Sequence, residues 1–146
     1  MTTSPTTPAP VPPTPLRTDP VRINPTTWNQ FLGFDQAQLR PAPSTWLTLA
    51  GQGPTDAEGR LQHAGDVPAQ LARCLDNVED LLGRAGFTFA DVLTMTVWTT
   101  DVDAVLAGYD VLIRRLAPAT PPATLVGVQR LALAGMAVEI TVQAGR

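Results

Sequence analysis

The fold is decided by residues 66–100, which read DVPAQLARCLDNVEDLLGRAGFTFADVLTMTVWTT. In the first part of this stretch apolar residues recur every three or four positions, as on one face of an α-helix. Asp66 stands at the N-cap, Pro68 falls in the first turn, and Gly86 follows as a C-terminal cap. Residues 92–100 alternate apolar and polar side chains, which predicts a strand with one buried face. The apolar helix positions are Val67, Leu71, Cys74, Leu75, Val78, Leu81, Leu82 and Ala85.

Two further patterns lie on the C-terminal side of this stretch. Asp101 is predicted to cap a second helix over residues 102–116, which ends before Pro118 because proline cannot continue a helix. Two alternating runs, 124–131 and 136–143, follow around a short glycine-bearing turn. We expect these two runs to form a closing β-hairpin.

Two short strand-like runs, 34–39 and 45–51, lie on the N-terminal side and predict another hairpin. The element order is then strand, strand, helix, strand, helix, strand, strand. Two helices that cover one face of a mixed sheet, with paired strands at either end, favour an α+β two-layer sandwich over a doubly wound fold. The other face of the sheet carries threonine and apolar residues together, so we expect a homo-oligomer to bury it.

Length and proline content divide the chain into two parts. Its 146 residues suit one domain, and 44% hydrophobic residues are enough for a core. Eight of the fifteen prolines fall within residues 1–27, a Thr/Pro-rich stretch without apolar periodicity. We therefore predict a flexible N-terminal extension over 1–27 and a folded domain over 28–146.

The charges exclude several classes of function. Ten basic and thirteen acidic residues give a net charge of −3, which does not favour binding to nucleic acid or to an anionic membrane. Every basic residue is an arginine, so a lysine Schiff base and a P-loop lysine are both excluded. Among the apolar runs, none approaches the length of a membrane span.

The chain has one cysteine, Cys74, and one histidine, His63. A disulfide framework or a structural zinc site needs more such residues, so we expect no metal and no cofactor. Cys74 lies on the apolar helix face and is interpreted as a core residue. The lone thiol, together with the lack of a signal-peptide pattern, predicts a cytoplasmic protein.

Short motifs distributed along residues 33–144 resemble those of the RidA family, also called YjgF/YER057c/UK114. The resemblance implies a chorismate-mutase-like α+β fold, a homotrimer packed sheet to sheet, and small-molecule sites between subunits. Active members hydrolyse reactive enamine or imine intermediates to a 2-keto acid and ammonia. The matching motifs are Gly33-Phe34-Asp35-Gln36-Ala37, Leu49-Ala50-Gly51-Gln52, Leu75-Asp76-Asn77-Val78, Asp91-Val92, Thr96-Val97-Trp98, Thr100-Asp101, and Arg130-Leu131 with Val138-Glu139-Ile140.

The resemblance also implies site residues, and it places Ala123 where the family has an arginine that grips the substrate carboxylate. A guanidinium suits that task because it binds a carboxylate through two parallel charge-assisted bonds. The next positions are Thr124 and Leu125, the latter where the family often has cysteine. This chain is therefore a divergent member whose standard activity is weakened or lost, unless Arg40 or Arg130 substitutes for the missing group.

Four more residues complete the predicted site. The resemblance makes Glu139 the catalytic residue that orients or activates water. The resemblance also implies that the backbone carbonyl of Gly51 faces the ligand, with Gln52 beside it. Phe34 stands where the family often has a tyrosine that contacts the ligand, so it keeps the aromatic wall and lacks the hydroxyl. Each residue also has a structural interpretation: an outward position on a strand for Glu139, a strand end for Gly51, and core packing for Phe34.

Three functions follow from these residues. The first is a trimer that hydrolyses or binds a metabolite other than the usual 2-imino acids. The second is an active enamine/imine deaminase, and the third is a non-enzymatic ligand-binding or regulatory protein. A ribonuclease activity is disfavoured because the chain lacks a basic stripe with interleaved aromatic residues.

Overall fold

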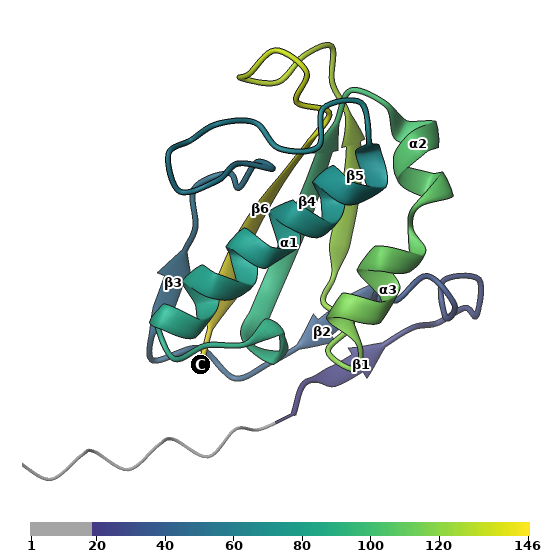
Figure 1. Ribbon diagram of the computed structural model, residues 1–146. Helices are drawn as coiled ribbons and strands as arrows, with labels where there is room; N and C mark the ends of the chain where they lie inside the picture. The colour runs from purple at the N-terminus through teal and green to yellow at the C-terminus, as the bar shows by residue number, and fades with distance from the viewer. Residues whose placement is uncertain (1–18) are drawn as a thin grey trace, which may run out of the picture.

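The computed structural model describes residues 19–146, which form one mixed sheet, a separate two-stranded ribbon and a layer of helices (Figure 1). In chain order the elements are β1 (Val21–Ile23), β2 (Ala37–Leu39), β3 (Trp46–Thr48), α1 (Val67–Arg84), the 3-10 helix η1 (Phe89–Asp91), β4 (Val92–Thr99), α2 (Val102–Ala107), α3 (Asp110–Leu116), β5 (Ala123–Gly127) and β6 (Val138–Gly145).

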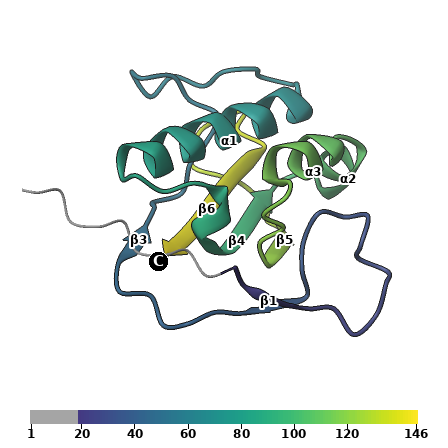
Figure 2. The same ribbon diagram turned by 90° about the horizontal axis from the view of Figure 1, so that it is seen from below.

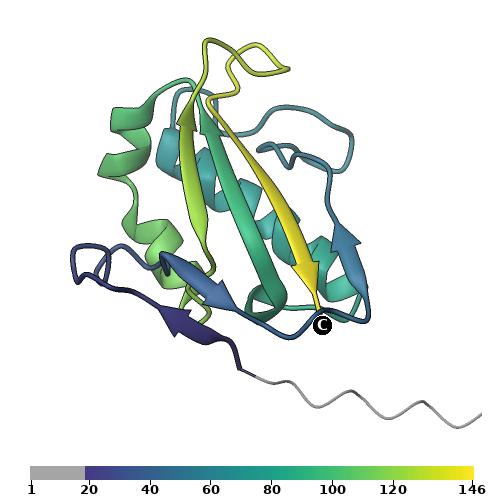
Figure 3. The same cartoon turned by 180° about the vertical axis from the view of Figure 1, so that it is seen from behind.

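The four-stranded sheet has the order β3-β6-β4-β5, with β4 and β5 parallel and the other pairs antiparallel. All three helices lie on one face of it (Figure 2). The opposite face, here called the open face, carries no helix, and the β1–β2 ribbon lies at one end of it (Figure 3). The α+β two-layer sandwich with a mixed sheet is thus confirmed.

Both predicted hairpins are wrong. β2 pairs with β1, not with β3, and β6 lies between β3 and β4 and does not pair with β5. The residues of β6 that face α1, among them Val138, Ile140 and Val142, are at most 2% exposed, and β6 occupies the middle of the sheet between β3 and β4. Alternation along a strand reveals its buried face but not its neighbours in the sheet.

The second helix is divided. The predicted helix over 102–116 is interrupted at Gly108 and Tyr109, which separate α2 from α3. At Gly108 the chain passes so close to α1 that a Cβ atom would lie 2.9 Å from Cγ of Pro68. This close approach requires glycine, and glycine in turn weakens a helix interior.

The predicted start of the folded domain also differs from the structure. Residues 19–27, assigned to the N-terminal extension, belong to the described chain, and Val21–Ile23 pair with Ala37–Leu39 as β1 and β2. A three-residue strand of this kind has too little periodicity to be recognised in the sequence. The predicted flexibility of residues 1–18 concerns residues outside those described.

Helix α1 forms the core with the inner face of the sheet. The Asp66 side chain accepts a hydrogen bond from Ala69 N at 3.0 Å, as expected of an N-cap, and Gly86 has a φ of +74° just beyond the helix. Cys74 is fully buried, and burial raises the pKa of its thiol to about 12, so it is an inert core residue.

Within residues 19–146 no helix combines the length and apolar character needed to cross a membrane.

Leu75 tests the contribution of this core. Leu75→Ala removes a side chain that is 0% exposed between α1 and the sheet, and we expect it to lower the free energy of unfolding by about 2–5 kcal/mol. Leu81→Ala, on the outer side of the same helix at 36% exposure, is the matched control and should cost about 1 kcal/mol or less. Urea denaturation measures both, and equal losses would contradict this packing.

Candidate functional site

Gly51 and Glu139 lie together on the open face, and Gln52, the partner of Ile140, joins their two segments through its backbone. Gln52 N donates to Ile140 O at 2.8 Å, and Ile140 N donates to Gln52 O at 3.0 Å, so the segment after β3 is paired with β6. This pairing places Gly51 directly beneath the Glu139 side chain: a Cβ atom on Gly51 would lie only 2.1 Å from Glu139 Oε1. The Glu139 carboxylate thus occupies the space that a side chain at position 51 would need, and glycine leaves that space free, which goes beyond the interpretation of a simple strand end.

Glu139 presents a carboxylate that is open to a ligand or to water. It is half-buried and lies opposite Trp98 on β4, whose indole Nε1 donates to Thr141 Oγ1 at 3.1 Å. Among the described residues, none donates a hydrogen bond to the Glu139 side chain. Its oxygens therefore keep their capacity to accept a hydrogen bond.

The other four predicted site residues line an apolar cavity of about 200 Å³. It lies between β4 and β5 of the sheet, the helices α2 and α3, and the segment 28–34, which we call the roof loop. Trp28 and Phe34 of this loop meet edge to face, with ring centroids 5.9 Å apart. The lining residues are Trp28, Leu32, Gly33, Phe34, Met95, Val97, Leu106, Tyr109, Leu112, Leu116, Ala123, Thr124 and Leu125, and none of them is charged.

The cavity and Glu139 are on opposite faces of the sheet. Ala123 and Leu125 pair with Met95 and Val97, whose side chains point into the core beneath the helices. Glu139 pairs with Trp98, the next residue along β4, and side chains alternate between faces. A single chain therefore does not bring Ala123 and Leu125 into one cleft with Glu139.

Tyr109 is a cavity residue that falls within the helix predicted over 102–116. It lies at the break between α2 and α3 and is one of the residues that line the cavity. Its hydroxyl makes no hydrogen bond to any described residue, and burial raises the pKa of this phenol, so the group stays neutral and can donate. No signal in the sequence distinguishes Tyr109 from a core residue, because the break at Gly108 depends on the contact with α1.

The two arginines considered as substitutes for the missing guanidinium do not line this cavity. Arg40 donates to Gln38 Oε1 and to Ala90 O, with Nη1 3.0 Å from the latter, and it borders a separate hollow with Arg22 and Arg146. Arg130 is exposed in the connection after β5. Among residues 19–146, no cation lines the cavity at Ala123. Nowhere in residues 19–146 do three His, Cys, Asp or Glu side chains gather as metal ligands would.

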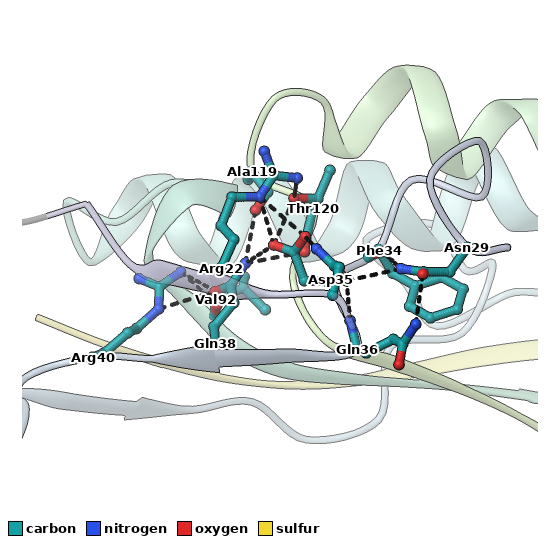
Figure 4. Close-up of polar contacts among 11 residues, drawn as sticks. Arg22, Asn29, Phe34, Asp35, Gln36, Gln38, Arg40, Val92, Ala119 and Thr120 are labelled. Carbon is teal, nitrogen blue, oxygen red and sulfur yellow. Dashed lines mark hydrogen bonds and ion pairs between the residues drawn. The ribbon is translucent and has the colours of Figure 1, made fainter. Parts of the chain in front are cut away.

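A buried carboxylate, Asp35, fixes the end of the roof loop (Figure 4). Its side chain is 1% exposed and accepts hydrogen bonds from Arg22 Nε at 2.9 Å, Gln38 Nε2 at 2.7 Å and Asn24 Nδ2 at 2.7 Å. Thr120, just before β5, donates its hydroxyl to the same carboxylate at 3.0 Å, and Asp35 N donates to Thr120 O. The network ties the β1–β2 ribbon and the roof loop to the strand that carries Ala123.

The Asp35 network predicts a pH dependence of stability. Burial by itself raises the pKa of Asp35, but the hydrogen bonds from Arg22, Gln38, Asn24 and Thr120 outweigh it and lower the pKa to about 2. A pKa below that of the unfolded chain means that this carboxylate stabilises the fold above about pH 4, and that the contribution is lost as pH falls towards 2.

We expect Asp35→Asn to lower the free energy of unfolding by about 2–3 kcal/mol at pH 7. The asparagine NH₂ group would face the hydrogen-bond donors that now surround the Asp35 carboxylate, and one of these donors would lose its acceptor. The difference from the unmodified protein should shrink in urea titrations between pH 5 and pH 2. Asp80→Asn, which breaks the exposed pair with Arg84 on α1, should cost about 0.5 kcal/mol or less. A difference that stays constant with pH would contradict the assignment.

Gly51→Ala tests the contact with Glu139. The added methyl group must displace the carboxylate, so we expect the side-chain carboxyl ¹³C resonance of Glu139 to shift and the melting temperature to fall. Only three glutamates are present in the chain, and Glu139→Gln identifies the resonance. Gly83→Ala is the matched control, because a Cβ there meets nothing within 4 Å and should slightly stabilise α1. An unchanged Glu139 resonance in Gly51→Ala would show that the carboxylate does not lie over Gly51.

Comparison with known proteins agrees with this architecture. The model of the family described as endoribonuclease L-PSP matches residues 36–145. The structure is similar to that of YyfB, a Rid-family protein of unknown function from Yersinia pestis, with 30% identity and a TM-score of 0.79 over 88% of this chain and 100% of that chain. A RutC family protein of Pyrococcus horikoshii is 29% identical over 86 residues, which are 59% of this chain and 68% of the relative.

A member of the YjgF/YER057c/UK114 family from Mycobacterium tuberculosis shares the fold, with 24% identity and a TM-score of 0.60 over 87% of this chain and 99% of that chain. The family match extends from the residue after Asp35 to the end of β6 and so includes the whole four-stranded sheet. The chain therefore belongs to the endoribonuclease L-PSP family, the Rid (YjgF/YER057c/UK114) group that its sequence motifs resemble.

Proposed function

We propose that this protein is a homotrimer that binds an uncharged small molecule between subunits and hydrolyses it. Glu139 and Gly51 of one protomer would complete the site whose other wall is the cavity around Ala123 in its neighbour. The observation that carries the proposal is the cavity itself: the position at which the family resemblance implies a carboxylate-binding arginine is Ala123, in a cavity to which the described part of the chain contributes no charged residue.

The open face supports the shared site. It carries Thr96, Trp98, Glu139 and Thr141, side chains that are half-buried in a single chain although no helix covers them. A second copy packed on this face would bury them further. Such packing would also bring one protomer's Glu139 towards its neighbour, which a single chain cannot do for its own cavity.

Glu139 would act as a general base in this site. Its carboxylate can take a proton from a water molecule while the water oxygen attacks an electrophilic carbon of the substrate. The protonated Glu139 can then return that proton to the leaving group as the bond between the carbon and the leaving group breaks. The Gly51 backbone lies against the carboxylate, which supports a fixed orientation of its oxygens. The catalytic role thus needs no group beyond Glu139, water and the substrate.

The lack of a cation argues against 2-imino acids as substrates. A carboxylate that enters an apolar site without its partner loses about 2–5 kcal/mol compared with a paired one. Since each ~1.4 kcal/mol is a factor of ten in rate, the deaminase reaction should be slower by at least about 30-fold. An active deaminase remains the alternative that a direct assay decides.

That assay couples the protein to an amino-acid dehydratase and follows release of the 2-keto acid. We expect no acceleration over buffer by the unmodified protein and a gain in rate from Ala123→Arg, which restores the guanidinium. Ala134→Arg, at an exposed turn position, is the matched control and should stay inactive. Acceleration by the unmodified protein would favour the deaminase, and an inactive Ala123→Arg with an unchanged oligomeric state would contradict the role assigned to position 123.

Two other functions have their own tests. If the protein only binds a metabolite, a ligand that shifts its melting temperature will remain chemically unchanged, and Glu139→Gln will not alter turnover because there is none. Cleavage of labelled RNA at low salt would support a ribonuclease, which the net charge of −3 disfavours. Sedimentation equilibrium measures whether the chain is a trimer.

A further inference from the structure

We propose that the apolar cavity is a subsite for a neutral, flat ring of about the size of benzene that carries one hydrogen-bond-accepting substituent. Only one part of the inference rests on the proposed function, namely that the ring is the end of the ligand at which hydrolysis does not occur. Binding of the ring itself concerns the residues of one chain. The argument has three parts: the size and lining of the cavity, the support of its walls, and its polar groups.

Size and lining define what the cavity accepts. Its volume is about 200 Å³, which exceeds the ~150 Å³ of an enclosed apolar cavity that binds benzene. Unlike that cavity it opens to solvent, at Trp28 and Leu106, which are 56% and 52% exposed. Three aromatic side chains, Trp28, Phe34 and Tyr109, are among the walls. Aromatic rings favour edge-to-face or offset contacts with another ring, so a flat ligand gains more here than a flexible chain. A charged group would lose its water without finding a counter-charge.

The walls are held apart by contacts that do not involve the cavity. Asn29, 1% exposed, donates from Nδ2 to Phe34 O at 2.8 Å and accepts from Gln36 Nε2 at 2.8 Å. Gly33 has a φ of +72°, and a Cβ there would lie 3.1 Å from Cα of Ile113, so the roof loop rests closely on α3. With Asp35 at its end, the loop is fixed by polar contacts, and Phe34 is prevented from collapsing onto Ala123 to fill the space.

The hydrogen-bonding groups of the lining side chains are all neutral. They are the Tyr109 hydroxyl and the indole N–H of Trp28, and neither makes a hydrogen bond to another described residue. Thr124 borders the cavity from strand β5, but it pairs with Thr96 and is exposed on the open face, so its hydroxyl is not one of them. Tyr109 lies at the N-terminus of α3 and lines the cavity. Its hydroxyl can donate a hydrogen bond to one substituent on the ring, and this bond would fix the orientation of the ligand in the subsite.

Three probes that share one ring separate these features: toluene, benzyl alcohol and benzoate. Binding to the full chain is measured by titration followed by NMR. We expect toluene and benzyl alcohol to bind and benzoate to bind at least about tenfold more weakly, because its charge is unpaired in the cavity. Tyr109→Phe should weaken benzyl alcohol about fivefold, the equivalent of one hydrogen bond, and leave toluene unchanged.

Filling the cavity gives the second test. Ala123→Phe should abolish toluene binding, whereas Ala134→Phe, at an exposed turn, should retain it. If Ala123→Phe does not fold, Leu106→Trp narrows the cavity from a lining position that is 52% exposed and should also reduce binding. Benzoate binding as tightly as toluene, or toluene binding undiminished in the filled variants, would overturn the proposal.

The outcomes for the subsite and for the proposed hydrolase are distinguishable. Toluene binding that depends on Ala123, together with no hydrolysis of any substrate and no effect of Glu139→Gln, leaves the ring subsite and removes the hydrolase. Hydrolysis that depends on Glu139 but is unaffected by filling the cavity leaves the hydrolase and removes the ring subsite.

Discussion

Every second side chain of β4 and β6 is buried beneath α1, and this burial fixes which way all the others point. Met95 and Val97 on β4, with Val138 and Ile140 on β6, are at most 3% exposed. Because side chains alternate across a sheet, Glu139 must then lie on the open face. The same alternation carries through the parallel pairing of β4 with β5, which turns Ala123 and Leu125 towards the helices. The separation of the two halves of the site follows from core packing.

The roof loop links stability to the site. Asp35 is placed under four side-chain donors that come from the β1–β2 ribbon and from the segment before β5. These bonds hold its pKa low, and they also hold Phe34 at the distance from Ala123 that leaves a cavity between them. Such an apolar space costs stability when it is empty. The polar contacts around Asn29 and Asp35 offset that cost and keep the site formed before a ligand binds.

The chemistry of the cavity explains how one position can redirect a family site. With a guanidinium at position 123, the site would select a carboxylate through paired hydrogen bonds. With alanine there, the same space is bounded by aromatic and aliphatic side chains and by neutral donors such as Tyr109. A charged ligand loses hydration on entry and gains no partner, whereas a neutral ring gains contacts with the walls. On the proposed function, ligand selectivity would change while the sheet and Glu139 stay in place.

The sequence by itself determined α1 with its Asp66 cap, the strand character of β4 and β6, and the α+β class. These are local patterns, because caps and alternation depend on neighbours along the chain. That Ala123 replaces the family's arginine stays a prediction from the resemblance. Only the tertiary structure decided that β6 lies between β3 and β4, that Gly51 supports Glu139, that Asp35 holds the roof loop, and that Tyr109 reaches the cavity. Each of these depends on residues far apart in the sequence, whose contacts are set by the packing of α1 against the sheet and are not encoded in any single segment.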